Sequence, residues 1–145
     1  MAIKVITPLK GSGPVPGVLE ISNRSQSNKA VKNYFPSQKV QTRGGTVILN
    51  NIEFVFAPQI NTFLVGRLKY AANNLTGHPA LARILGYESK DDNIVGGMFS
   101  REHHGEFFTT EHSGHYWQNW NDLIRNQFIE FMKSKGIEIN HSQGL

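Results

Sequence analysis

The clearest hydrophobic pattern in the chain lies near its C-terminus and is typical of an amphipathic helix. Apolar residues recur there at intervals of about one helical turn, so they share one face. Asn121 or Asp122 is suited to cap the start of this helix, and Gly136 is suited to end it. We expect a structural helix that covers one face of a sheet. Its apolar face consists of Ile124, Phe128, Phe131 and Met132.

Shorter apolar runs earlier in the chain predict strands. Residues 46–49, 52–56 and 61–65 are rich in β-branched and aromatic side chains. A glycine pair opens the first run, and an asparagine pair is the candidate turn that follows it. The order of the three runs predicts an antiparallel meander.

Two later segments predict a hairpin. Residues 94–99 form an apolar run that contains Gly96 and Gly97, and glycines inside a strand indicate a bulge or a close backbone approach. Residues 102–105 are suited to the turn, and residues 106–110 to the returning strand.

Two further helices are expected. Residues 22–34 have a helix-compatible composition and are followed by a proline, and residues 79–85 have proline at their start and glycine after them. Residues 1–17 contain too many glycines and prolines for regular structure, so we expect an extended lead-in or linker remnant. Residues 1–145 are thus expected to form a single α+β domain. Its sheet is mainly antiparallel, with N-terminal and short central helices and the C-terminal covering helix.

The composition is that of a folded protein and excludes several kinds of chemistry. Of the 145 residues, 39% are hydrophobic and 18% are charged, and no apolar run approaches the ~20 residues that a membrane span needs. The chain has no cysteine, which excludes disulfides, thiol nucleophiles and thiolate zinc sites.

The net charge of +4 is concentrated in the first third of the chain. Residues 1–50 carry seven basic side chains and one acidic side chain, Glu20, whereas the remainder is slightly acidic. This distribution is typical of a surface that binds nucleic acid, although lysines also serve simply to solvate a surface.

Residues 111–116, Glu-His-Ser-Gly-His-Tyr, concentrate side chains that can transfer protons or bind phosphate. Four of the six histidines of the chain lie between positions 103 and 115, and histidine can act as general base and general acid near pH 7. If the preceding strand continues through His112, the glycine two residues later lets the chain bend and re-aims His115 and Tyr116. The motif predicts either a catalytic edge of the sheet or a purely structural, hydrogen-bonded corner.

The other histidines carry weaker signals. His103 and His104 lie in the expected hairpin turn and are typical of exposed polar surface. His78 precedes Pro79 at the start of a short helix, where it is suited to cap the helix or to approach a bound phosphate. We expect His141, near the C-terminus, to be inert.

A metal site is an alternative use of the clustered groups. His112 and His115 are three residues apart, and Glu102, Glu106 and Glu111 lie near them. That spacing suits ligands on a helix, but this stretch is expected to be strand and bend. It reproduces neither a His-Glu-x-x-His helix nor another specific zinc or magnesium pattern, so we expect no metal and no other cofactor.

Motifs over most of the chain resemble polymorphic toxin type 43 domains, and the most specific of them is Ser-Gly-His-Tyr at residues 113–116. Two positions depart from the pattern: His112, where no fixed histidine is expected, and Trp117, where a small residue is usual. The first departure favours His115 over His112 as the catalytic histidine. The matching segments are residues 16–20, 33–34, 52–56, 78–82, 95–101, 105, 110–111, 113–116, 119–120, 124–125 and 128.

The resemblance implies a toxin module used in competition between bacteria. Such domains are predicted ribonucleases of the Barnase–EndoU–colicin–RelE group and are neutralised by a cognate immunity protein. The resemblance therefore implies an RNA substrate, with tRNA as the first choice, and no membrane partner. It also implies secretion or delivery as the C-terminal part of a larger toxin that acts in the cytoplasm of the target cell.

Metal-independent RNA cleavage needs three kinds of group, and the resemblance assigns candidates to each. A base must take the proton of the ribose 2′-hydroxyl, an acid must protonate the leaving 5′-oxygen, and a cation must stabilise the phosphate. His115 and His78 are the first choice for the acid–base pair. Arg101 is the choice for the phosphate, because a guanidinium matches its geometry.

Supporting roles are assigned in the same way. Glu111 is expected to orient an imidazole or to act as the base, and Ser113 and Tyr116 are expected to donate to phosphate oxygens. His112 is a secondary catalytic candidate. The candidates for RNA binding are Arg24, Lys29 and Lys32.

Two rival functions stay open from the sequence. One is a metal-dependent nuclease toxin that uses the clustered histidines as ligands. The other is a basic module that binds RNA or protein without catalysis and whose histidines are structural.

Overall fold

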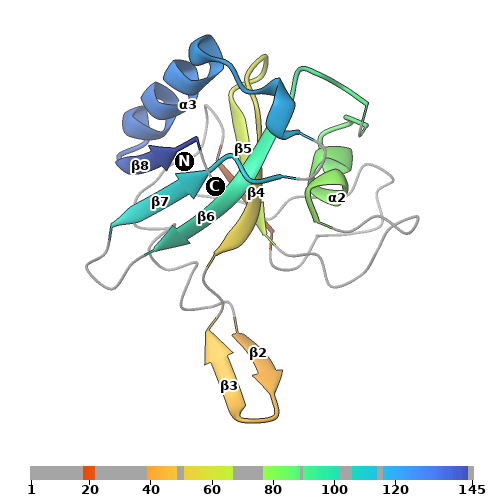
Figure 1. Ribbon diagram of the computed structural model, residues 1–145, viewed down its shortest axis with the longest axis vertical. Helices are drawn as coiled ribbons and strands as arrows, with labels where there is room; N and C mark the ends of the chain where they lie inside the picture. Colours follow the sequence, from red (N-terminus) through yellow and green to blue (C-terminus); the bar gives the residue numbers. More distant parts are fainter. Residues whose placement is uncertain are drawn as a thin grey trace.

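Figure 1 shows the computed structural model of the chain, with uncertain segments as a grey trace. The structure describes residues 18–21, 39–48, 51–66, 77–88, 90–101, 106–113 and 116–143. Three expectations therefore lie outside the described residues: the lead-in at 1–17, the helix at 22–34 and the hairpin turn at 102–105. None of the described helices has the length and apolar character that crossing a bilayer requires.

The main element is a six-stranded sheet with the strand order β1-β5-β4-β6-β7-β8. Every neighbouring pair is antiparallel except β7 and β8, which run parallel. The expectation of an α+β fold with a mainly antiparallel sheet is thus confirmed. The strands are β1 Val18–Ile21, β4 Ile52–Ala57, β5 Thr62–Gly66, β6 Val95–Arg101, β7 Phe107–Thr110 and β8 Ile139–Ser142.

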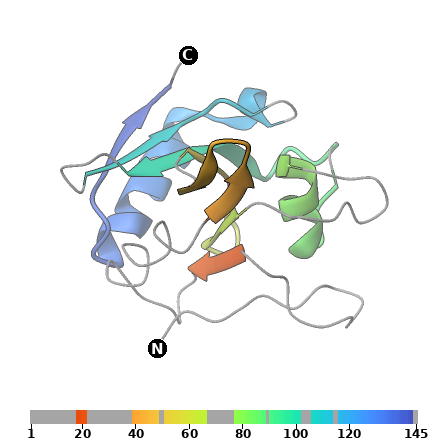
Figure 2. The same ribbon diagram turned by 90° about the horizontal axis from the view of Figure 1, so that it is seen from below.

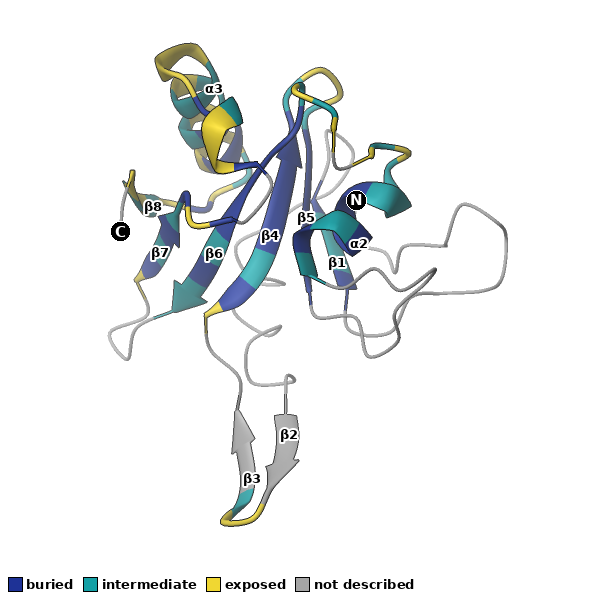
Figure 3. Ribbon diagram, turned by 45° about the vertical axis from the view of Figure 1, so that its right-hand side comes forward, coloured by how far each residue is buried: buried dark blue, intermediate teal, exposed yellow. Residues whose placement is uncertain are grey.

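Two helices cover opposite faces of this sheet. The C-terminal helix α3 (Asp122–Ser134) packs on the face of β4 that carries Phe54 and Phe56. The shorter helix α2 (Gly77–Ile84) packs on the face that carries Val55 and Ala57. Successive residues of a strand point to opposite faces, so each helix has its own apolar core. Figure 2 shows the two helices on either side of the strands, and Figure 3 shows that β4 and β5 between them are almost entirely buried.

The C-terminal helix confirms its sequence prediction in detail. Asn121 is the N-cap, and its side chain accepts a hydrogen bond of 2.9 Å from the backbone N–H of Ile124. Phe128 and Met132 are fully buried. Gly136, with φ of 78°, follows the helix in the left-handed conformation that favours glycine.

The predicted three-stranded meander is wrong in its first strand. The pair β4–β5 forms as expected, but β3 (Gly45–Ile48) pairs with β2 (Lys39–Thr42) in a separate two-stranded sheet. Thr42 lies opposite Gly45, so Arg43 and Gly44 form a two-residue hairpin turn. The glycine pair therefore closes a hairpin with the preceding segment, and Figure 1 shows this hairpin projecting away from the main sheet.

A further strand follows α3. Residues 139–142 form β8 beside β7, with His141 opposite Thr109. These residues alternate between half-buried and exposed, and most of them are polar, so they lack the apolar run that predicts a strand. The short edge strand β1 was not predicted either.

Close packing at Gly97 generates the first prediction. A Cβ atom built on Gly97 would overlap the backbone oxygen of Thr110 and lie 2.9 Å from the ring of Phe54. Because a backbone oxygen cannot move aside as a flexible side chain can, Gly97→Ala is expected to lower the free energy of unfolding by about 3 kcal/mol. Urea denaturation measures this loss. Ser100→Ala on the same strand is the control, and equal stability of the two variants would contradict the packing argument.

Candidate functional site

His78 is held against strand β6 by its own side chain. It lies in the first turn of α2, and its Nε2 is 2.7 Å from the carbonyl oxygen of Gly97. A carbonyl oxygen only accepts hydrogen bonds, so Nε2 carries the proton of this bond. In the neutral imidazole Nδ1 is then the basic nitrogen. The bond therefore sets both the orientation of the ring and its tautomer.

Gly96 brings His78 and Ser113 together. A Cβ atom built on Gly96 would lie 2.9 Å from Cδ2 of His78 and 3.3 Å from Cβ of Ser113. The two side chains thus occupy the space that a larger residue would fill, although they come from α2 and from the segment after β7. Both residues are buried, with His78 7% exposed. Two of the predicted candidates therefore lie against the same glycine.

A carboxylate that was not predicted lies beside this pair. A Cβ atom built on Gly77 would be 2.6 Å from Oε2 of Glu53, so the carboxylate is packed against the residue that precedes His78. Glu53 lies opposite Met98 in the sheet and shares the α2 face with Val55. The sequence signal that could have identified Glu53 is its charge within the otherwise apolar strand at residues 52–56. Glu53, His78 and Ser113 are called the α2-side site below.

Arg101 lies at the far end of β6 from this site. Its guanidinium carbon is 5.9 Å from the centre of the Phe107 ring, which indicates a cation–π contact. Five residues separate it from Gly96, which corresponds to about 17 Å along a strand and to the opposite face. The structure therefore does not place Arg101 beside His78.

Tyr116 is a core residue. Its side chain is fully buried in the apolar cluster beneath α2, and its hydroxyl donates to the carbonyl oxygen of Glu88 at 3.4 Å. Burial, followed by the negative charge of Asp91, raises the pKa of Tyr116 to about 12. The hydroxyl that was expected to donate to an RNA phosphate is thus buried and donates to a backbone carbonyl in this structure.

The remaining candidates are exposed or lie outside the described residues. His112 is exposed, and its backbone N–H donates to Oγ1 of Thr110 at 3.3 Å. The histidines and basic residues that the sequence singled out and that lie outside the described ranges are His115, His103, His104, Arg24, Lys29 and Lys32.

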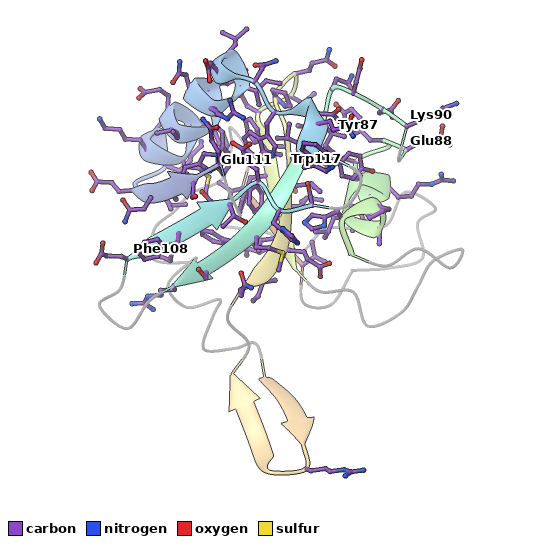
Figure 4. The ribbon with its side chains drawn as sticks, in the orientation of Figure 1. Tyr87, Glu88, Lys90, Phe108, Glu111 and Trp117 are labelled. Atoms are coloured by element: carbon purple, nitrogen blue, oxygen red, sulfur yellow. The ribbon has the colours of Figure 1, made fainter. Side chains whose placement is uncertain are left out.

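Glu111 lies in a second polar cluster, on the α3 side of the sheet. Its carboxylate receives two hydrogen bonds from the guanidinium of Arg125, at 2.6 Å to Oε2 and 2.9 Å to Oε1. Arg125 also donates to Asp122 at 2.9 Å. The bond to Glu111 is the main cause that raises the pKa of Arg125, which stays protonated. Figure 4 shows Glu111 near α3, with Phe108 farther along β7.

His141 completes this cluster. Its Nε2 lies 2.8 Å from Oε2 of Glu111, and its Nδ1 lies 2.7 Å from Oγ1 of Thr109. A carboxylate only accepts, so Nε2–H donates to Glu111 and Nδ1 of the neutral ring accepts from the Thr109 hydroxyl. The ring packs on Trp120, with the centroids 4.9 Å apart. Burial lowers the pKa of His141, and the bond to Glu111 only partly opposes this shift.

Thr109, Glu111, Arg125 and His141 are called the Glu111 clamp below. Glu111 was predicted to orient an imidazole, and the imidazole that it contacts is that of His141. The side chains of His141 and Glu111 are only 4% and 6% exposed, whereas 21% of the Arg125 side chain is exposed. Within the described ranges no three histidine, aspartate or glutamate side chains converge as metal ligands would.

Comparison with known proteins decides the family. The sequence profile of the family described as bacterial toxin 43 matches residues 2–127, which is most of the chain. The chain belongs to the bacterial toxin 43 family. The resemblance found in the sequence motifs is thereby confirmed, and a bacterial toxin function is established at the level of the family. Neither the comparison with curated proteins nor that with solved structures gives a significant match.

The clamp of this toxin 43 domain generates a stability prediction. Arg125→Ala leaves the buried Glu111 carboxylate without its main partner, which costs about 2–3 kcal/mol, somewhat less than in a fully buried pair because a fifth of the Arg125 side chain is exposed. Urea denaturation at pH 7.5 measures the loss. Lys90→Ala, which removes an exposed ion pair with Glu88, is the control and should leave stability unchanged. Equal effects of the two substitutions would contradict the assigned role of Arg125.

The lowered pKa of His141 predicts a pH dependence of stability. The unfolded chain binds a proton near the ordinary histidine pKa of 6.5, whereas the folded chain binds it only at lower pH. Stability from this group is therefore complete above pH 6.5 and is lost as the pH falls below it, by at most about 1.4 kcal/mol per pH unit. The check is urea denaturation from pH 7.5 to 5, in which His141→Gln should show a shallower decline than wild type. Parallel curves would exclude this role for His141.

Proposed function

We propose that this toxin 43 domain is a metal-independent endoribonuclease whose catalytic centre is the α2-side site. The observation that carries the proposal is the packing of His78 and Ser113 against the same glycine, Gly96. His115 follows Ser113 by two residues, and two steps along the backbone span at most about 7 Å between Cα atoms. On the proposal, His115 supplies the second histidine of this site.

The chemistry divides between these groups. On the proposal, His78 and His115 serve as the acid–base pair, one taking the proton of the ribose 2′-hydroxyl and the other protonating the leaving 5′-oxygen. Nδ1 of His78 is the atom suited to this task, because Nε2 is engaged with Gly97. The hydroxyl of Ser113, which donates to the carbonyl oxygen of Glu111 at 3.5 Å in this structure, is the proposed donor for a phosphate oxygen. DNA is spared because it lacks the 2′-hydroxyl.

Glu53 adds a third ionisable group that the sequence did not single out. Its carboxylate borders the first turn of α2, next to Gly77, the residue that precedes His78. A carboxylate in this position is suited to act as an alternative base. Arg101, which lies at the other end of β6, is then suited to bind a flanking phosphate rather than the scissile one.

The biological setting follows from the family. Membership in bacterial toxin 43 supports delivery of the domain from a producing bacterium as part of a larger toxin. Action in the target-cell cytoplasm, a structured RNA such as tRNA as the substrate, and a cognate immunity protein are the finer parts of the proposal. Arg24, Lys29 and Lys32 remain its candidates for RNA binding, and membership in the Barnase–EndoU–colicin–RelE group is its expectation for ancestry.

Substitution of the two histidines tests the proposal. His78→Gln keeps a donor toward Gly97 but cannot transfer protons, and it is expected to lower RNA cleavage by about 10²–10⁴-fold, as is His115→Ala. The exposed His112 provides the control, since His112→Ala should cleave like wild type. Total RNA from bacteria that express each variant is compared on a denaturing gel. Intact RNA in cells that are killed by the wild-type domain would remove the ribonuclease proposal.

Chelation separates the proposal from its nuclease rival. Cleavage of purified RNA is expected to continue in EDTA, and to stop when the substrate carries 2′-deoxyribose, because the 2′-oxygen is the internal nucleophile. Loss of activity in EDTA that one divalent ion restores would instead establish the metal-dependent nuclease. Toxicity that survives both histidine substitutions in folded protein would favour a binding module.

A further inference from the structure

The Glu111 clamp contains three ionisable side chains that the proposed reaction does not use. The side chains of Glu111 and His141 are buried, and Glu111 precedes Ser113 by only two residues. We propose that Arg125 and His141 are positioning residues: by holding Glu111 from two separate elements, they fix the path of the chain into the α2-side site. This inference rests on the proposed ribonuclease function and deepens it.

The contacts of Glu111 determine both its place and its orientation. Arg125 binds both carboxylate oxygens with its fork of N–H groups, and His141 adds a third hydrogen bond to Oε2. A bidentate pair restricts rotation of the carboxylate as well as its distance. Two residues later, the Ser113 side chain contacts the opposite, α2-facing side of β6 at Gly96. The clamp therefore holds the point from which the chain turns toward His78.

The far end of the same segment is held in the structure as well. Tyr116 is fully buried, and Asn119 donates to the carbonyl oxygens of Asp91 and Ile94 at 3.1 Å and 2.8 Å. Residues 111–116 are thus anchored at Glu111 and at Tyr116. The core beneath α2 holds the Tyr116 end of this segment. The clamp holds the Glu111 end through Arg125 of α3 and His141 of β8.

A buried ion pair is a costly way to obtain stability alone. Desolvation of both charges cancels much of their attraction, and apolar side chains of similar volume often stabilise a core equally well. What an apolar pair does not supply is a directed contact that fixes the carboxylate and the adjoining backbone. The chemistry of the clamp therefore favours a positioning role over a purely stabilising one.

The test uses substitutions that keep the fold but loosen the geometry. Arg125→Lys keeps the charge and loses the fork, and His141→Gln keeps a donor but not the ring. The matched control is Glu106→Gln, since Glu106 is an exposed carboxylate that accepts from Asn140 of β8 at 3.2 Å. Folding of each variant is verified by denaturation, and kinetics are measured well below the unfolding temperature. Activity is expressed per folded molecule.

The expected result is a selective loss in the chemical step. Both clamp variants should lower kcat by about 10–100-fold with KM within about twofold of wild type, because a shift of about 1 Å in a catalytic group has such an effect. The nuclear magnetic resonance signals of the His78 ring and the Ser113 amide should shift in both variants and stay unchanged in Glu106→Gln. Wild-type kcat per folded molecule, with unchanged signals, would overturn the inference and leave the clamp a stabilising element.

The two readouts keep the two proposals separate. A wild-type domain that cleaves no RNA contradicts the proposed function, whereas the resonance shifts still decide whether the clamp positions residues 111–113. If the wild-type domain is active but the His78 and Ser113 resonances do not change in the clamp variants, only the positioning role is contradicted.

Discussion

The glycine pair of β6 is the constraint on which the rest of the structure depends. At Gly96 the absence of a Cβ atom makes room for His78 from α2 and for Ser113 from the segment after β7. At Gly97 it admits the backbone of Thr110. Both glycines also supply carbonyl oxygens, one to Nε1 of Trp120 at 2.8 Å and one to Nε2 of His78. Three parts of the chain, α2, residues 110–113 and Trp120, therefore meet on two residues without side chains, and the candidate site is built from the space that these residues leave.

How much the sequence could predict differs between elements for physical reasons. The helix α3 has periodic apolar positions, a cap and a terminal glycine, and the structure confirms each of them. β2 and β8 lack an apolar run, so their existence depends on partners that local patterns do not reveal. The same holds for the site. The density of ionisable groups drew attention to residues 111–116, and the helix start drew attention to His78. Their shared contact at Gly96 depends on tertiary packing, which the sequence pattern does not reveal. His141 was expected to be inert because nothing near it in the sequence reveals the carboxylate that it meets.

The segment 111–116 also shows that one motif can serve two purposes. Glu111 and Tyr116, at its ends, are buried and engaged with the core, whereas Ser113 faces the candidate site. A run of six chemically active residues therefore does not imply six active-site residues. In this toxin 43 domain the carboxylate and the phenol hold the segment in place, and the proposal assigns the chemistry to the residues between them together with His78.

The position of β8 in the chain has a consequence for when the fold is completed. His141 reaches the clamp from residues 139–142, which are synthesised after every other described element. The chain leaves the ribosome from its N-terminus, so β1, β4, β5, β6 and β7 emerge before the strand that secures the segment following β7. Until β8 has emerged, Glu111 lacks its hydrogen bond from His141. Among the described elements, the contacts around Glu111 are therefore completed last during translation.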